Sequence, residues 1–125
     1  MKSRDGALKL KRFEADEKQR KVADIESMIH EFELMAGDLS RQIASEEERT
    51  GVRDDAHFAY STFARAAAQR RSNLLASVAN LREKLELAVA VRDEAFAELE
   101  GVVTTEDRGA ERSRRVERDA GDARI

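Results

Sequence analysis

The 125-residue sequence contains no proline and no cysteine, and its six glycines are all isolated. Because nothing in such a chain forces frequent turns, the sequence predicts long helices. The absence of cysteine excludes a disulfide framework and a thiolate metal site, which fits a reducing compartment. No apolar run is long enough for a signal peptide or for a membrane span of about 18 residues. We therefore expect a cytoplasmic protein that does not insert into a membrane.

Charge is abundant and unevenly distributed. Charged residues make up 39% of the chain and hydrophobic ones 41%, with a mean hydropathy of −0.66. This supplies enough apolar surface for a seam between helices but not for a thick globular core, so we expect an elongated molecule. Residues 1–21 carry eight Lys or Arg against four Asp or Glu, whereas residues 22–50 carry two against eight. The net charge of −3 argues against a nucleic-acid partner recognised by bulk positive charge.

Apolar residues recur every seven positions in both halves of the sequence. The first half contains the series Leu8, Ala15, Val22, Ile29, Ala36 and Ile43, together with Ile25, Phe32 and Leu39. The second half contains the series Tyr60, Ala67, Leu74, Leu81, Ala88, Ala95 and Val102, together with Ala64, Val78, Leu85 and Leu99. Two such series, offset by three or four positions, are the a and d positions of a coiled coil. Arg71 and Arg92 interrupt the second half, although their long stems can lie along a seam.

These two patterns predict an all-α fold, an antiparallel two-helix coiled-coil hairpin with a projecting C-terminal segment. Gly51 is a typical residue at a helix C-terminus, and Asp54, Asp55 or Ser61 could cap the helix that follows. The predicted boundaries are helix 1 at 1–50, the turn at 51–57, helix 2 at 58–105 and a charged extension at 106–125. The first seam is polar at both ends, so we expect stability to be concentrated around residues 22–43. The low helix propensity of Gly101 and the Val-Val-Thr-Thr after it favours fraying of the extension.

Three of the six aromatic residues crowd into residues 56–63, at or beside the predicted turn: Phe58, Tyr60 and Phe63. Large rings can seal the seam at the closed end of a hairpin, where Leu and Ala would leave a gap. Alternatively, one or two of the rings point outward and dock a partner, because aromatic residues are preferred anchors of small interfaces. Phe58 and Phe63 cannot both share a helical face with Tyr60, and the sequence leaves both interpretations open.

No catalytic, cofactor or metal motif is present. His30 lies between Glu26 and Glu33, but the paired Glu-x-x-His units of a di-iron bundle are missing. His57 lies near Ser61 without an identifiable acidic third member of a triad. The scattered glycines cannot form a phosphate-binding loop. We therefore expect a protein that is not an enzyme and that uses no cofactor and no metal.

Three segments together resemble the alphaproteobacterial branch of the FliJ family of flagellar type III export proteins. They are MKSRDGALKLKRFEADEKQRKVADIE at the start, IASEEERTG at the end of the first helix and HFAYSTFARAAAQRRSNLLASVANLREKLE at the start of the second. The resemblance covers about residues 2–100 and rests on segment order and overall character. It implies a two-helix coiled coil similar to the central stalk of rotary ATPases. It also implies a non-enzymatic role at the inner-membrane export apparatus, with a hexameric export ATPase, a membrane export gate and export chaperones as partners.

Geometry and charge suggest where a protein of this kind would contact those partners. The candidate contacts to the ATPase ring are the basic residues of the open end, Lys2, Arg4, Lys9, Lys11, Arg12, Arg108, Arg112, Arg114 and Arg115. The candidate contacts to the export gate are the residues of the turn end, Phe58, Tyr60, Phe63, Arg70 and Arg71.

Two other function classes are compatible with the sequence. Additional apolar positions flank both seams, at Met28, Met35, Leu75, Val89, Phe96 and Val103. They could join two hairpins into a self-associating four-helix bundle, a purely structural role. A tether to membrane or nucleic acid through the basic start of the chain is disfavoured, because the acidic residues 22–50 follow directly.

Overall fold

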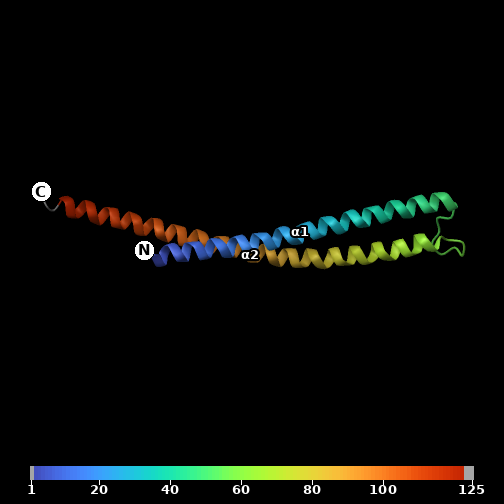
Figure 1. The fold of residues 1–125 in the computed structure, drawn as a ribbon, viewed down its shortest axis with the longest axis horizontal. Helices are drawn as coiled ribbons and strands as arrows, with labels where there is room; N and C mark the ends of the chain where they lie inside the picture. Colours follow the sequence, from blue (N-terminus) through green and yellow to red (C-terminus); the bar gives the residue numbers. More distant parts are fainter. Residues whose placement is uncertain (1, 123–125) are drawn as a thin grey trace. The chain divides into compact units, whose positions relative to one another are not determined.

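The computed structural model describes residues 2–122, and side chains within residues 5–121. Within this part of the chain, all regular secondary structure is helical (Figure 1). Helix α1 spans Lys2–Thr50 and helix α2 spans Thr62–Asp122, and residues 51–61 connect them. The two helices pack against each other in antiparallel orientation, which confirms the predicted all-α hairpin. Neither helix contains a stretch long and apolar enough to cross a membrane, as far as the described residues go.

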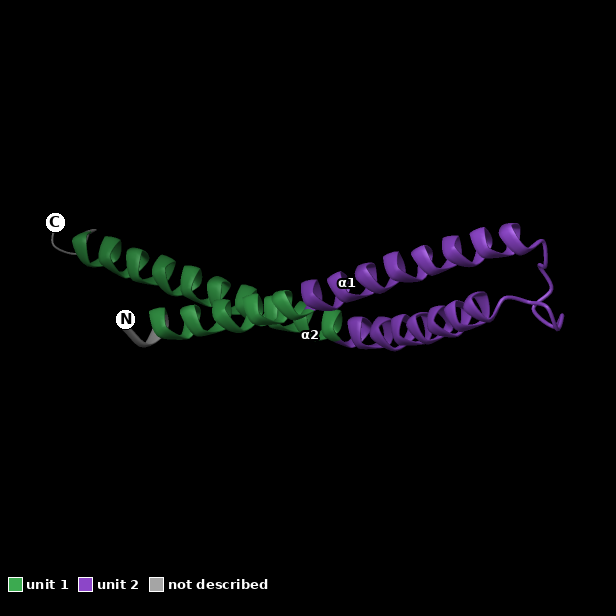
Figure 2. Ribbon diagram, turned by 45° about the vertical axis from the view of Figure 1, so that its right-hand side comes forward, with its two compact units in different colours: residues 1–21, 88–125 green, residues 22–87 purple. Residues whose placement is uncertain are grey.

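The chain divides into two compact units, each built from one stretch of α1 and one stretch of α2 (Figure 2). Residues 22–87 form what we call the loop unit, because it contains the connection between the helices. Residues 1–21 and 88–125 form the terminal unit, which contains both ends of the chain.

The loop unit has the larger apolar core. Its buried residues are Val22, Ile25, Ile29, Ala36, Leu39 and Ile43 from α1, and Ala64, Ala67, Val78 and Leu81 from α2, with Tyr60 from the connection. Every one of them belongs to the predicted heptad series. Burying a Val, Leu or Ile side chain contributes about 1.5–3 kcal/mol, so the branched aliphatic residues of α1 dominate the stability of this unit.

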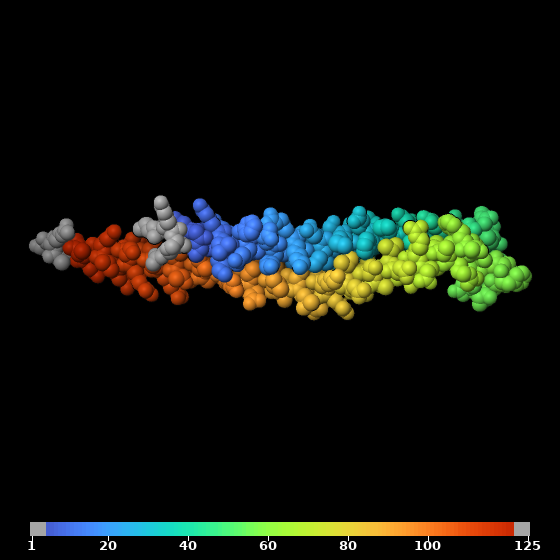
Figure 3. Space-filling view, turned by 60° about the horizontal axis from the view of Figure 1, so that its bottom comes forward, coloured from blue at the N-terminus to red at the C-terminus, as the bar shows by residue number. Residues whose placement is uncertain are grey.

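The terminal unit has a thinner core and a projecting helix. Only Ala15 and Ala88 are buried among its described residues, and Leu8, Leu99 and Val102 are half-buried. Helix α2 continues past the start of α1, and all residues from 111 to 121 are exposed. In Figure 3 the red end of α2 extends beyond the blue atoms of α1 on the face in view. The predicted projecting segment is therefore present.

Helix α2 continues without a break through the region where low propensity favoured fraying. The hydroxyls of Thr104 and Thr105 donate to the carbonyl oxygens of Glu100 and Gly101, each at 2.8 Å. Such bonds to the preceding turn satisfy the hydroxyls inside the helix and let β-branched residues remain helical.

Helix α1 ends as the sequence predicts. Gly51 adopts φ = 76°, a left-handed conformation that glycine tolerates best. Its N–H donates to the carbonyl of Glu47 at 2.9 Å, which satisfies one of the last carbonyls of the helix. The Val52 N–H donates to the Thr50 hydroxyl at 3.2 Å and continues the cap into the loop.

The prediction that helix 2 begins at residue 58 is wrong, because α2 begins at Thr62. Two successive turns occupy the additional residues: the His57 N–H donates to the Asp54 carbonyl, and the Tyr60 N–H donates to the His57 carbonyl, both at 3.0 Å. Tyr60 therefore reaches its heptad position from a turn rather than from a helix. The predicted turn at 51–57 extends in the structure to Ser61.

Ser61 is the residue that caps α2. Its Oγ accepts the Ala64 N–H at 3.2 Å, and its carbonyl accepts the Arg65 N–H at 3.0 Å, the geometry of an N-cap. Asp54, a predicted alternative cap, accepts the Ala56 N–H at 2.9 Å instead and stabilises the loop.

Each unit pairs helical segments of opposite charge. In the loop unit, residues 22–50 of α1 carry two basic and eight acidic residues, and residues 62–87 of α2 carry five basic and two acidic ones. In the terminal unit the signs are reversed. Residues 1–21 of α1 carry eight basic and four acidic residues, whereas residues 88–107 of α2 carry one basic and six acidic residues. Parallel pairing of two copies of α1 would bring like charges together at both ends. The charge distribution therefore favours the antiparallel hairpin.

Individual bridges between the helices follow this distribution. In the loop unit, Arg82 pairs with Glu33 at 2.7 Å. In the terminal unit, Lys11 pairs with Glu98 at 3.1 Å. Exposed pairs of this kind contribute about 0–1 kcal/mol each, so they influence register and orientation more than total stability.

Candidate functional site

The three aromatic residues at the loop have different environments. Tyr60 is only 8% exposed and packs in a cluster with Leu39, Ile43, Ala64 and Ala67. Phe58 is 95% exposed and Phe63 is 56% exposed. Tyr60 therefore seals the seam, and Phe58 and Phe63 point outward, which is the orientation that the docking interpretation requires.

The exposed ring of Phe58 is held by its neighbour. The His57 and Phe58 rings stack with centroids 4.6 Å apart and an interplanar angle of 24°. His57 Nδ1 accepts the Ala59 N–H at 3.0 Å. The Phe58 ring therefore rests against His57, and almost nothing else covers it.

Tyr60 belongs to the structural core of the loop unit rather than to a free surface. The Arg65 guanidinium lies 5.4 Å from the centroid of its ring, a cation–π distance. Burial, followed by the nearby carboxylates of Glu47 and Asp55, raises the pKa of Tyr60, so the phenol stays neutral. The prediction that Tyr60 is a docking residue is wrong in this structure, because its ring is covered.

The two predicted arginines of this surface also differ. Arg71 is half-buried, and its Nη1 donates to the Ser40 hydroxyl of α1 at 3.1 Å, so its guanidinium is used within the hairpin. Arg70 is exposed, and it lies seven residues after Phe63, hence on the same face of α2. We call Phe58, Phe63 and Arg70 the loop surface.

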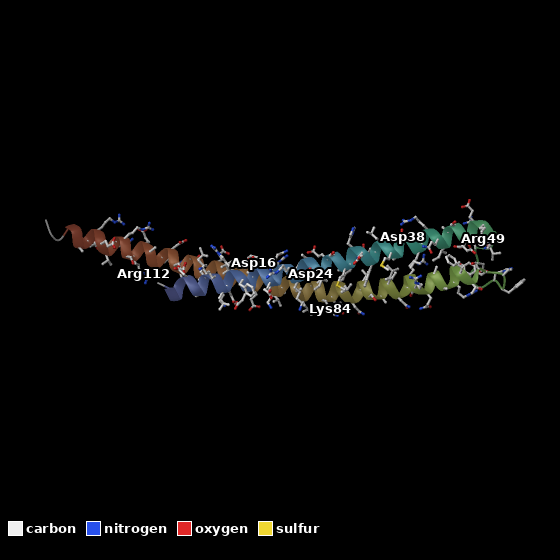
Figure 4. All side chains as sticks on the ribbon, viewed as in Figure 1. Asp16, Asp24, Asp38, Arg49, Lys84 and Arg112 are labelled. Carbon is white, nitrogen blue, oxygen red and sulfur yellow. The ribbon has the colours of Figure 1, made fainter. Side chains whose placement is uncertain are left out.

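Glu46 connects the end of α1 to Ser61, the residue that caps α2. Its side chain is 17% exposed, pairs with Arg49 at 2.6 Å and accepts the Ser61 hydroxyl at 2.8 Å. These hydrogen bonds, first from Arg49 and then from Ser61, lower the pKa of Glu46 from 4.5 to about 2. Figure 4 labels Arg49 at this end of α1.

The basic residues predicted near the N-terminus differ in how far they reach solvent. The side chains of Lys2 and Arg4 lie outside the described residues. Lys11 is half-buried between the helices, with its Nζ 3.1 Å from Glu98 Oε2 and 3.5 Å from Glu14 Oε2. The hydrogen bond to Glu98 is the main cause that raises the pKa of Lys11. Lys9 and Arg12 are exposed, so Lys11 connects the helices while its two neighbours remain accessible.

The basic residues predicted in the projecting segment occupy two faces of α2. Arg108, Arg112 and Arg115 are spaced by four and three residues and share one face, with Arg112 labelled in Figure 4. Arg114 lies on another face, where it pairs with Glu111 at 3.1 Å. Arg118 joins the same carboxylate at 3.5 Å. We call Lys9, Arg12, Arg108, Arg112 and Arg115 the terminal surface.

Sequence reasoning missed two apolar residues beside the basic ones. Leu10 is 55% exposed and Phe13 is 58% exposed, although both are large and hydrophobic. Their positions outside the heptad series, three residues apart, were the available signal. A groove of about 580 Å³ lies elsewhere in the same unit, lined by Ala7, Lys11, Glu98, Gly101, Val102, Thr105 and Glu106.

Comparison of the sequence and structure with models of protein families, with curated proteins and with solved structures finds no match. Across the described residues, His, Asp and Glu side chains nowhere gather in a group of three or more that could hold a metal ion. The functional proposal therefore depends on the loop surface, the terminal surface and the resemblance of the sequence.

Proposed function

We propose that the protein is a non-enzymatic coupling protein of the flagellar type III export apparatus. In this proposal the terminal surface binds the ring of the hexameric export ATPase, the loop surface binds the membrane export gate, and the protein handles export chaperones. It would act in the cytoplasm, at the periphery of the inner-membrane export apparatus. The sequence resemblance described above is the source of these partners.

One observation carries the proposal: two exposed surfaces of different chemistry belong to different units of one hairpin. The loop surface is aromatic, with Phe58 at 95% exposure. The terminal surface is cationic and solvated. A protein that couples two different partners needs two separate contacts, and each unit of this chain supplies one of them.

The loop surface has the composition of a small, anchored interface. Aromatic and arginine side chains are enriched among residues that dominate binding energy, and truncating such an anchor commonly costs about 2 kcal/mol or more. The stack with His57 presents the Phe58 ring beside a second ring, which enlarges the aromatic surface that a partner can cover.

The terminal surface has the composition of a reversible contact. Solvated Lys and Arg side chains attract an acidic partner over roughly a Debye length, about 8 Å at physiological salt. Such contacts accelerate association more than they slow dissociation. This behaviour suits a protein that acts inside an ATPase ring that changes conformation.

The loop surface can be tested with purified components. Phe58→Ala combined with Phe63→Ala should weaken binding to the export gate by at least tenfold, roughly the loss of one anchor. Leu87→Ala is the matched control, because Leu87 is also exposed in the loop unit but lies outside the loop surface. Unchanged gate binding by the double variant, with its helicity intact by circular dichroism, would contradict the loop assignment.

The whole proposal can be tested by recovering the protein from motile cells. Co-purification of the export ATPase with the wild-type chain is the expected result. Recovery without the ATPase, from cells in which both proteins are present, would contradict the proposed function.

A self-associating structural protein is the second candidate. Met28 and Met35 are each 42% exposed, and they lie seven residues apart on one face of α1 in the loop unit. Leu75 of α2 in the same unit is 49% exposed. A dimer mass by light scattering at micromolar concentration would favour this candidate, and a monomer mass would contradict it.

A further inference from the structure

We infer that Leu10 and Phe13 are the apolar anchors of a docking site in the terminal unit, whose partner is an acidic protein surface with an apolar cleft. The inference rests on the proposed function, in which that partner is the export ATPase ring. It changes the expected nature of the contact, because the proposed function assigns the contact to basic residues alone.

The two side chains form a pair on a free face of α1. They lie three residues apart, so they are neighbours on one helical face. The seam of α1 in this unit is formed by Leu8, Lys11 and Ala15, which are half-buried or buried. Leu10 and Phe13 are therefore outside the contact with α2 and contribute little to the core of their unit.

A single exposed apolar residue is ordinary and needs no explanation. Leu34 provides the comparison, because it is 56% exposed on the same helix. Its neighbours one turn away are His30, Glu31, Gly37 and Asp38, so it stands alone among polar residues and glycine. Leu10 and Phe13 instead lie within one turn of each other and together form one apolar patch. A patch of two large side chains can fill a cleft on a partner.

The charged residues beside Leu10 and Phe13 indicate what kind of partner would bind them. Lys9 precedes Phe13 by one turn, and Arg12 is adjacent to it, and both are exposed. Within residues 5–121, neither of these two cations makes an ion pair, whereas Lys11 is committed to Glu98. Residues 1–21 carry a net charge of +4 from their eight basic and four acidic residues. The complementary surface is one that places carboxylates around an apolar cleft.

A protein partner fits this face better than a membrane surface. Helices that lie on membranes carry a continuous apolar face with basic residues along the polar side. Here only two large apolar residues are present, and Asp16 and Glu17 follow Phe13 by three and four residues on the same side. Those carboxylates would face anionic lipid headgroups and oppose binding to them.

The salt dependence of binding distinguishes a site with apolar anchors from a purely ionic site. A contact made by lysine and arginine alone weakens steeply as salt shortens the Debye length from about 10 Å at 0.1 M to about 3 Å at 1 M. Burial of Leu10 and Phe13 in a cleft does not depend on charge. Part of the affinity should therefore persist at high salt.

The experiment measures the Kd of the full-length chain for the purified export ATPase at low and high salt. Leu10→Ala combined with Phe13→Ala should raise the Kd at least about tenfold at both salt concentrations. Leu34→Ala should leave the Kd unchanged, and Lys9→Ala combined with Arg12→Ala should raise it at low salt only. Because alanine is the best helix former, these variants should keep their helicity, which circular dichroism checks.

The possible outcomes distinguish this inference from the proposed function. Binding by the wild-type chain with an unchanged Kd in the Leu10/Phe13 variant would overturn the inference and leave the proposed function standing. No binding by the wild-type chain would overturn the proposed function and, with it, the partner named here. In a parallel assay, binding to vesicles of anionic lipid that is lost in the same variant would overturn the choice of a protein partner.

Discussion

The loop unit and the terminal unit use the same helices and the same heptad series, but they are stabilised differently. Among the described residues thirteen hydrophobic ones are buried, and eleven of them belong to the loop unit. The two in the terminal unit are alanines, and its seam admits Lys11 and Arg92 as half-buried polar residues. The positions of a heptad series therefore determine which faces of two helices pack together. The size of the side chains at those positions determines how much the packing stabilises the pair.

Polar contacts between the helices contribute a larger share of the stability where the apolar seam is thin. In the terminal unit, Lys11 binds Glu98, and Arg92 Nη1 donates to Gln19 at 3.3 Å, so two seam positions are occupied by bridges between the helices. In the loop unit one seam position, Arg71, is likewise bridged to Ser40, but this bridge and that of Arg82 with Glu33 accompany a core that is already buried. We expect the terminal unit to respond to salt and the loop unit to respond to truncation of its core.

The largest expected effect comes from truncating the core of the loop unit. Ile43→Ala should lower the free energy of unfolding by about 3 kcal/mol, because it removes buried methyl groups and leaves a cavity. Leu99→Ala, the matched change in the terminal unit, should cost about 1 kcal/mol, because Leu99 is only half-buried. Urea unfolding followed by circular dichroism measures both values. Equal losses would remove the difference between the two units.

A second pair of variants compares two rings within the loop unit. Tyr60→Ala should lower the Tm clearly, because the ring closes the cluster formed by Leu39, Ile43, Ala64 and Ala67. Phe58→Ala should leave the Tm nearly unchanged, since its ring is 95% exposed. Thermal unfolding of the two variants side by side is the measurement. A larger loss from Phe58→Ala would mean that the loop surface is part of the core.

The junction between the loop and α2 should be less sensitive than the core. Ser61→Ala removes the cap that accepts the Ala64 N–H, and a change of this kind typically costs about 1 kcal/mol. Ser72→Ala, at an exposed position inside α2, is the control and should be neutral or slightly stabilising. If the two serine variants had the same unfolding midpoint in urea, Ser61 would have no capping role.

The smallest expected effect is a pH dependence that arises from Glu46. Its pKa is lower in the folded chain than its ordinary value of 4.5, so the unfolded chain binds more protons between pH 4.5 and about 2. The contribution of Glu46 is therefore complete above pH 4.5 and is lost as the pH falls toward 2. Glu46→Gln should flatten the dependence of the unfolding free energy on pH in this window. An identical slope for wild type and Glu46→Gln would contradict this role.

The sequence alone predicted the seam of the hairpin well. All the buried residues, from Ala15 to Ala88, occupy positions of the two heptad series, because a seven-residue repeat identifies the buried face of a long helix directly. Gly51 as the end of α1 and Ser61 as a possible cap were also predictable, since both roles depend on local chemistry.

The surroundings of the loop could not be predicted in the same way. Tyr60 fits the heptad series but lies in a turn. A heptad repeat predicts which residues are buried, but it does not predict whether their backbone is helical. The roles of Phe58 and Arg71 depend on contacts with His57 and with Ser40. The second of these contacts joins residues 31 positions apart in the sequence, and no single-sequence pattern encodes it.

Native-state hydrogen exchange of the full-length chain tests the contrast between the units most directly. The amides of α1 from residue 22 to 43, and those of α2 facing them in the loop unit, should exchange slowest, at rates set by global unfolding. The amides of residues 111–121, which are all exposed, should exchange fastest. Equal protection along both helices, or slower exchange in the terminal unit than in the loop unit, would contradict the account.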